Sequence, residues 1–215
     1  MCAFNRRFDP SYAQLRDRVR AGQVGTVHVV KTTSRDSPKP PISYLATSGG
    51  IYQDCAVHDI DLVCWVLGEY PTSVSSQAHC FCPDIAAIDD FDTLVINMKF
   101  PSGALGSIDI SRHAVYGYDI RLEAFGQKGQ LTAAEKRPTQ VTLHDDRGAT
   151  VAPICYSFAS RFREAYCNEL DHFVDMVKRG AAPSVTSQST LAVDKIATAA
   201  EQSARTGKVI ELRWD

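Results

Sequence analysis

The sequence predicts an α+β fold in which an open, mainly antiparallel β-sheet carries helices packed on one face. The central part of the chain, 71–154, is a succession of short β-rich segments separated by turn sequences typical of hairpins. Helical patterns come before and after this block and do not alternate with its strands. Because hairpins join antiparallel neighbours, whereas parallel strands need a long crossover, this order favours an antiparallel sheet.

The elements before the strand block have recognisable start and stop signals. Asp9-Pro10 places a capping carboxylate before a proline in the first helical turn, and Gly68 is suited to end a helix. We therefore expect, in chain order, a short strand over 1–8, a helix over 10–21, a β-branched strand over 24–34, a proline-containing surface loop over 35–47, and a helix that opens at Ser48-Gly49-Gly50 and ends before Gly68.

The strand block and the C-terminal part are divided by turn residues. Pro101-Ser102-Gly103 and Asp146-Arg147-Gly148 are hairpin signals, and Gly180-Ala181-Ala182-Pro183 separates two helical patterns. We expect strands over 72–81, 91–100, 104–112, 117–125, 129–134, 139–144 and 148–154, helices over 159–179 and 188–206, and a closing strand over 208–214.

Composition excludes several classes of protein. The 215 residues are 44% hydrophobic and 22% charged, which is typical of a globular chain that builds its core without disulfides. With 23 Lys and Arg against 25 Asp and Glu, the net charge of −2 argues against a nucleic-acid or anionic-membrane partner. The seven cysteines form no C-x-x-C pair, and no secretory signal or membrane-length apolar run is present. We expect a cytoplasmic protein with reduced thiols.

Common cofactor and nucleophile motifs are absent. The 13 glycines never fall in the order G-x-G-x-x-G, and the P-loop, the G-x-S-x-G elbow and H-E-x-x-H do not occur. The sequence itself therefore predicts no nucleotide-binding turn and no nucleophile elbow, and it lacks this metal-binding motif.

The sharpest local feature is Asp54-x-x-x-His58 within the predicted second helix. A spacing of four places both side chains on one helix face, where a carboxylate raises the basicity of an imidazole and orients it as a general base. An ordinary surface pair has the same spacing, and so does a pair of metal ligands, although no third ligand is evident.

A second feature is Tyr116-Gly117-Tyr118, which enters a predicted strand. Two tyrosines that flank a glycine can frame a polar ligand with their hydroxyl groups, and strand tyrosines can equally pack as core. The sequence alone leaves both interpretations open.

Several of these segments, in this order, resemble the C-terminal domain of the glucose–fructose oxidoreductase, inositol dehydrogenase and rhizopine-catabolism (Gfo/Idh/MocA) family, and within it most resemble myo-inositol 2-dehydrogenases. The resemblance covers nearly the whole chain. The segments that carry it are Phe4-Asn5-Arg6-Arg7-Phe8-Asp9-Pro10, Ser34-Arg35-Asp36, Gly49-Gly50-x-x-x-Asp54-x-x-x-His58-Asp59, Tyr116-Gly117-Tyr118-Asp119-Ile120 and Arg161-Phe162-x-x-Ala165-Tyr166-x-x-Glu169.

The resemblance implies an NAD- or NADP-dependent oxidation of a polyol or sugar hydroxyl to a ketone. In that scheme His58 takes the hydroxyl proton, Asp54 orients His58 or binds substrate, and Tyr118, Tyr116 and Asp36 contact ring hydroxyls.

The resemblance also implies a domain organisation. Residues 1–8 match the last strand of the family's dinucleotide-binding domain, and 9–215 match its substrate-binding and oligomerisation domain. Because the family's glycine fingerprint and catalytic lysine are not in this sequence, we expect the chain alone to bind no nicotinamide cofactor and to be inactive. We also expect a homo-oligomer that forms through the sheet; the alternative is a non-catalytic binding or assembly module of the same fold.

Overall fold

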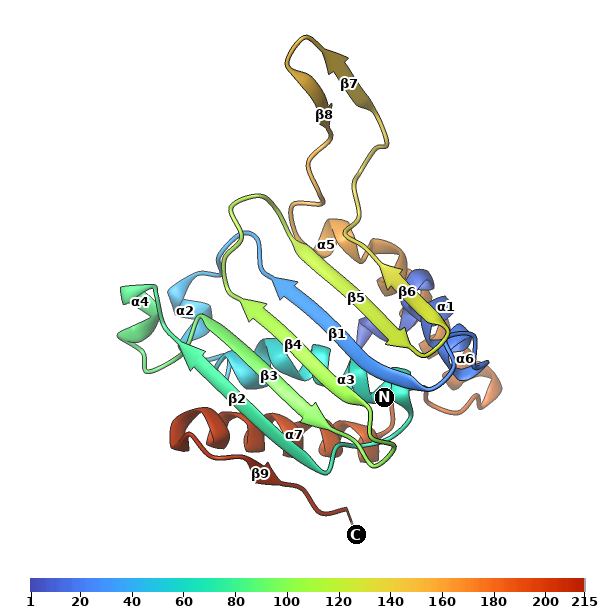
Figure 1. Cartoon of the computed structure of the whole chain (residues 1–215), viewed down its shortest axis with the longest axis vertical. Helices are drawn as coiled ribbons and strands as arrows, with labels where there is room; N and C mark the ends of the chain where they lie inside the picture. The colour runs from blue at the N-terminus through green and yellow to red at the C-terminus, as the bar shows by residue number, and fades with distance from the viewer. Residues whose placement is uncertain (215) are drawn as a thin grey trace.

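The computed structural model describes residues 1–214. Seven strands form one sheet in the order β6-β5-β1-β4-β3-β2-β9, and two further strands form a separate hairpin (Figure 1). The strands are β1 (Val27–Arg35), β2 (Ser73–His79), β3 (Thr93–Lys99), β4 (Leu105–Ser111), β5 (Asp119–Gly126), β6 (Gly129–Ala133), β7 (Thr142–Asp145), β8 (Gly148–Val151) and β9 (Ile210–Glu211).

All neighbours in the large sheet are antiparallel except β1 and β4, which run parallel. The predicted α+β class and the mainly antiparallel sheet are therefore confirmed. After β1 the chain forms helices and the two strands β2 and β3 before it reaches β4. This long connection allows β4 to lie beside β1 in the parallel direction.

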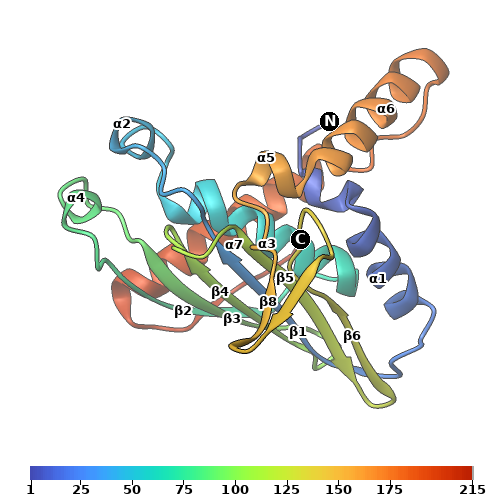
Figure 2. The same cartoon turned by 90° about the horizontal axis from the view of Figure 1, so that it is seen from above.

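The helices cover one face of the sheet, and the opposite face carries no helix in the described part of the chain (Figure 2). They are α1 (Pro10–Arg20), α2 (Ile42–Leu45), α3 (Val57–Leu67), α4 (Pro83–Ala86), α5 (Phe158–Arg161), α6 (Arg163–Arg179) and α7 (Ser187–Thr206), with the short η1 (Asn5–Phe8) and η2 (Tyr52–Ala56). The core lies between the sheet and α1, α3 and α7, where side chains such as Ile60, Ile96, Ile108 and Ile196 are fully buried.

The predicted strand over 1–8 is wrong, because Asn5–Phe8 forms a 3₁₀-helix. Two buried ion pairs hold this turn against α3: Arg6 Nη1 lies 2.8 Å from Asp59, and Arg7 Nη2 lies 2.5 Å from Asp61. The turn thus brings two guanidinium groups to α3.

Other differences are local. The expected loop 35–47 contains α2, and α4 forms in a stretch for which no helix was expected. The expected helix 159–179 is broken at Phe162, whose φ of −108° and ψ of 18° are not helical. The closing strand is only Ile210–Glu211.

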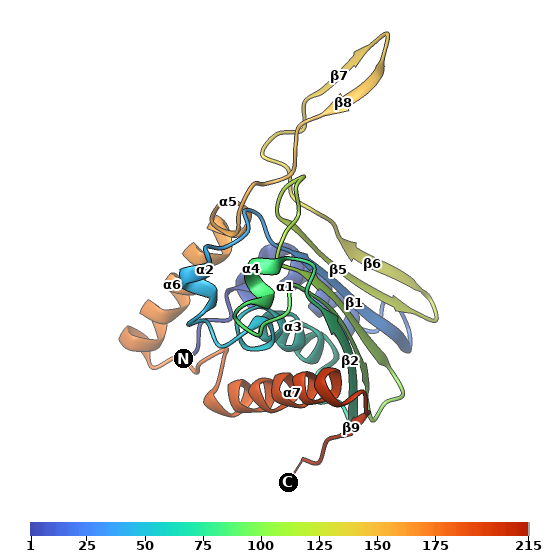
Figure 3. The same ribbon diagram turned by 90° about the vertical axis from the view of Figure 1, so that its left-hand side faces the viewer.

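The β7–β8 hairpin projects away from the rest of the molecule (Figure 3). Every residue of both strands is exposed, including Leu143 and Val151. The hairpin therefore contributes nothing to the core.

No helix of residues 1–214 is long and apolar enough to cross a membrane.

Candidate functional site

A pocket of about 510 Å³ opens where the C-terminal end of β1 meets η2, α3 and α5. Aromatic rings, the proline-containing segment after β1 and several polar side chains form its wall. Its lining residues are Asn5, Arg6, Ser34, Asp36, Ser37, Pro38, Lys39, Pro40, Pro41, Tyr44, Asp54, Cys55, His58, Ile110, Tyr118, Phe158, Phe162 and Tyr166. Four of the five residues expected at a substrate site, Asp36, Asp54, His58 and Tyr118, thus share one pocket.

Asp54 lies on η2, a π-helix that leads directly into α3. Gly49 and Gly50 precede it with φ values of +88° and +86°, so the expected helix begins at Ile51 and not at Ser48. A Cβ on Gly50 would lie 3.2 Å from Asp90 Oδ1, and glycine therefore permits this close approach. Single π turns within helices are rare and are often found at functional sites.

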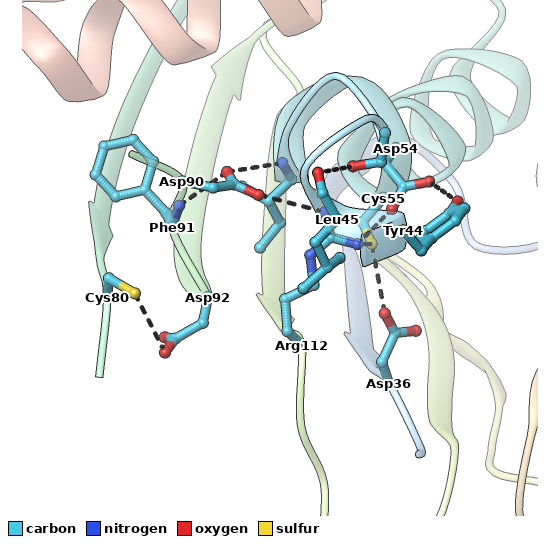
Figure 4. Close-up of polar contacts among 12 residues, drawn as sticks. Asp36, Tyr44, Leu45, Asp54, Cys55, Cys80, Asp90, Phe91, Asp92 and Arg112 are labelled. Carbon is cyan, nitrogen blue, oxygen red and sulfur yellow. Dashed lines mark hydrogen bonds and ion pairs between the residues drawn. The ribbon is translucent and has the colours of Figure 1, made fainter. Parts of the chain in front are cut away.

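The Asp54 carboxylate contacts Arg112 and Tyr44 (Figure 4). It makes no hydrogen bond to His58. The Tyr44 hydroxyl donates to Asp54 Oδ1 over 2.6 Å, and Nη1 of the fully buried Arg112 donates to Oδ2. The hydrogen bond from Tyr44 to the Asp54 carboxylate raises the pKa of Tyr44 to about 12. Asp54 is therefore fixed by a cation and a phenol, and it acts on His58 only through its charge.

His58 presents a neutral imidazole to the pocket. Burial, together with the nearby Arg6 cation, lowers the pKa of His58 to about 4, although the Asp54 charge acts in the opposite direction. Its Nδ1 is buried without a hydrogen-bond partner, and its ring packs edge-to-face on Phe4 with 5.6 Å between centroids. Near neutral pH the ring is therefore uncharged, and an unprotonated ring nitrogen can accept a hydrogen bond from a ligand.

The lowered pKa makes the stability of the fold depend on pH. Because the pKa of His58 is about 4 in the folded chain and 6.5 ordinarily, the unfolded chain takes up the proton first as pH falls. The stabilisation is complete above pH 6.5 and is lost as pH falls through about 4. We expect urea unfolding to show a loss of up to about 3 kcal/mol over this interval. The His58→Gln variant should lack this loss. If the free energy of unfolding varies with pH in the same way in both proteins, His58 is not the group responsible.

Tyr118 and Asp36 lie on the same pocket wall. Tyr118 is 7% exposed, and burial raises the pKa of its hydroxyl, which stays protonated and able to donate. Burial also raises the pKa of Asp36, while the nearby Arg112 cation opposes this, and its Oδ2 accepts from Cys55 Sγ over 3.5 Å. The pair therefore offers one donor and one acceptor to a polar ligand.

Tyr116 does not line this pocket. It is 52% exposed, and its hydroxyl donates to Asp119 Oδ2 over 2.7 Å. Gly117 between the two tyrosines has φ +123°, and a Cβ there would lie 2.5 Å from Ile154 Cγ1. This turn in the backbone sends the two tyrosine side chains to different surroundings.

Three polar residues at the site had no individual prediction from the sequence. Arg6 Nη1 donates to Ser34 Oγ over 3.0 Å and to Asp59 Oδ1 over 2.8 Å, which fixes a cation beside His58. Arg112 and Tyr44 bind the Asp54 carboxylate. Their spacing in the sequence gives no signal, because Arg6 and Tyr44 reach the pocket, and Arg112 reaches Asp54, only through the tertiary fold.

Within residues 1–214, no cluster of three or more His, Cys, Asp or Glu side chains is arranged to hold a metal ion. The pocket instead combines a proton acceptor with hydrogen-bonding groups and ring faces. Such a site suits a small polar ligand.

Comparison with known proteins identifies relatives along almost the whole chain. The myo-inositol 2-dehydrogenase of Thermotoga maritima is 39% identical over 97% of this chain and 63% of its own length. The scyllo-inositol 2-dehydrogenase (NAD(+)) of Bacillus subtilis is 37% identical over 97% of this chain and 61% of its own. The crystal structure of a myo-inositol dehydrogenase from Corynebacterium glutamicum superposes with a TM-score of 0.95 at 35% identity, covering 100% of this chain and 65% of that one.

This chain thus spans a little over three fifths of the length of these relatives. Residues 12–132 match the family described as the GFO/IDH/MocA C-terminal domain. With the matching sheet and helix arrangement, this assigns the chain to the C-terminal domain of the Gfo/Idh/MocA family.

Proposed function

We propose that this chain is the polyol-binding part of an NAD- or NADP-dependent oxidoreductase that acts on a CH–OH group of a polyol or sugar, with an inositol as the first candidate substrate. The observation that carries the proposal is the shared pocket, which sets the neutral imidazole of His58 beside Asp36, Asp54 and Tyr118. The names of the relatives, which are inositol dehydrogenases, support it.

The proposed roles follow from the state of each group. Oxidation of a secondary alcohol to a ketone removes a proton from oxygen and a hydride from carbon. His58 accepts the hydroxyl proton, since its ring is neutral at pH 7. Tyr118 donates a hydrogen bond to a ring hydroxyl, and the Asp36 and Asp54 carboxylates accept from others. These contacts orient the ring so that one C–H bond points out of the pocket.

The residues of this chain do not fit a dinucleotide. A pyrophosphate needs a glycine-rich turn with free amides at a helix N-terminus. The helices α1, α6 and α7 follow Asp9, Phe162 and Thr186. The helix that begins at Ile51 does follow Gly49-Gly50, but the Asp90 carboxylate accepts from the Ile51 amide over 3.0 Å and would repel a phosphate there. NAD⁺ is the acceptor named for the Bacillus subtilis relative. For this chain the assigned steps concern the polyol and its proton, and we propose that it binds no nicotinamide cofactor by itself.

The test is calorimetric titration of the chain with myo-inositol and scyllo-inositol. We expect binding, and we expect Tyr118→Phe to weaken it roughly three- to tenfold, the usual worth of one hydrogen bond. The matched control is Tyr116→Phe, which removes the same hydroxyl outside the pocket and should leave the affinity unchanged. Equal effects of the two variants would contradict the assigned site.

The same titration with NAD⁺ and NADP⁺ should give no heat. Micromolar binding of either nucleotide would reveal a cofactor site in this chain and overturn that part of the proposal.

We also propose that the chain forms a homo-oligomer through the uncovered face of the sheet. On β3 and β4 the outward residues Val95 and Leu105 are 42% and 48% exposed, and Phe125 on β5 is 44% exposed. An apolar sheet face normally needs cover. Light scattering at micromolar concentration should show an oligomer, and Val95→Lys with Leu105→Lys should dissociate it. A monomeric unmodified chain would refute this proposal.

A further inference from the structure

Asn5, the first residue of η1, lines the candidate pocket and has no role in the scheme above. The residues on either side of it both make contacts next to it in the core. The Phe4 ring packs edge-to-face on the His58 ring, and the Arg6 guanidinium forms a buried ion pair with Asp59. Asn5 therefore belongs to a segment of the pocket wall that contacts His58.

The carboxamide of Asn5 is buried with one polar atom unpaired. The residue is 5% exposed, and its Nδ2 is buried without a hydrogen-bond partner within residues 1–214. Among the residues that line the pocket, only His58, through Nδ1, shares this property within the same described range. Buried polar groups in proteins nearly always have a partner, because an unpaired one costs free energy. An unpaired donor in a pocket wall indicates a partner on the ligand.

The turn that carries Asn5 is held on two sides. Arg6 and Arg7 form ion pairs with α3, and Asn168 Nδ2 on α6 donates to the Phe8 carbonyl oxygen over 3.1 Å. A side chain on a turn fixed in this way is already ordered before a ligand binds. A ligand group that pairs with the carboxamide therefore gains affinity at little cost in conformational entropy.

We propose that Asn5 is a specificity-determining residue of this pocket, whose carboxamide nitrogen donates a hydrogen bond to one ring hydroxyl of the polyol. This inference rests on the proposed function. A site that hydrogen bonds to a substrate hydroxyl discriminates against the analogue without that hydroxyl, because the group on the protein is then left unpaired. Asn5 thus selects a polyol with a hydroxyl at the ring position that faces η1.

The first test is calorimetric titration with myo-inositol. We expect Asn5→Ala to bind the polyol roughly three- to tenfold more weakly than the unmodified chain, the usual worth of one hydrogen bond. The matched control is Asn168→Ala, which removes the same carboxamide from a residue that contacts η1 but lies outside the pocket. Its affinity should be unchanged. An Asn5→Ala chain that binds as tightly as the unmodified chain would overturn the proposal.

The mono-deoxy derivatives of myo-inositol identify the hydroxyl that Asn5 contacts. For the derivative without that hydroxyl, the unmodified chain and Asn5→Ala should bind with equal affinity, because neither can form the hydrogen bond. For the other derivatives the difference between the two proteins should persist. If the ratio of affinities is the same for every derivative, Asn5 does not pair with a ring hydroxyl.

A second variant separates binding from folding. Asn5→Leu nearly keeps the shape of the side chain and removes the unpaired donor, so its urea midpoint should equal or exceed that of the unmodified chain. Its affinity for myo-inositol should nevertheless fall as in Asn5→Ala. A lower midpoint with unchanged affinity would assign Asn5 a structural role and refute the inference.

These outcomes differ from a failure of the proposed function. If the unmodified chain binds no inositol, both the proposed function and the role of Asn5 are wrong. If it binds inositol and the two Asn5 variants bind equally well, only the role of Asn5 is wrong.

Discussion

Replacing His58 by alanine should lower the turnover of a polyol by about 10²–10⁴-fold, the usual contribution of a positioned general base. The assay requires a chimera that joins this chain to the dinucleotide-binding domain of a relative, with reduced cofactor measured by absorbance. The loss is expected in kcat, because the ring contacts that we propose for Tyr118 and Asp36 remain. A chimera with His58→Ala and near-normal turnover would remove His58 from the mechanism.

The control for this variant is His113→Ala, because His113 is exposed and outside the pocket. The pH profile supplies a further check. Since the pKa of His58 is about 4, the imidazole stays neutral well below the ordinary value of 6.5. The acidic limb of kcat/KM should therefore lie well below pH 6.5, with activity lost as pH falls and His58 becomes protonated. A limb near 6.5 would indicate a different base.

Replacing Arg112 by methionine should lower the free energy of unfolding by about 3–5 kcal/mol, the cost of removing one partner from a buried ion pair. Arg112 is fully buried; its Nη1 contacts Asp54 and its Nη2 lies 3.6 Å from Asp90 Oδ2. Without the guanidinium, the Asp54 and Asp90 carboxylates lose their shared cation. Urea unfolding followed by circular dichroism measures the change.

The matched control is Arg147→Gln. Arg147 also pairs with an aspartate, Asp145, but its side chain is 81% exposed, and such pairs contribute about 0–1 kcal/mol. Adding Asp54→Asn to Arg112→Met should recover part of the loss, because it removes one of the unpaired charges. If Arg112→Met lowers the free energy of unfolding by less than Arg147→Gln does, the role assigned to the Arg112 cation is wrong.

Much of the fold was predictable because its signals are local. The Asp9 carboxylate caps α1 by accepting from the amides of Ser11 and Tyr12, and Gly68 ends α3 with φ +78°, as their positions in the sequence indicate. The 3₁₀ turn of η1 was not predictable in this way. Its shape depends on Arg6 and Arg7 pairing with carboxylates on α3, more than 50 residues away.

The same distinction applies to the pocket. Asp54 and His58 attract attention because four residues separate them, and both do line the pocket. The partner of Asp54 is nevertheless Arg112, which approaches it from the end of the sheet 58 residues later. Tyr116 and Tyr118 look equivalent in the sequence, and only the positive φ of Gly117 separates them. Spacing therefore finds candidate side chains, whereas their partners depend on the tertiary fold.

The position of β1 has a consequence for the order in which the chain is synthesised. β1 lies inside the sheet, but its neighbours are β4 and β5, so both of its partners follow it by many residues. A nascent chain that ends before Leu105 contains β1 and the β2–β3 hairpin but neither strand that pairs with β1. Contacts of such long sequence separation have a high loop-closure entropy and favour slow folding. A strand made early thus remains unpaired at both edges until the middle of the chain is complete.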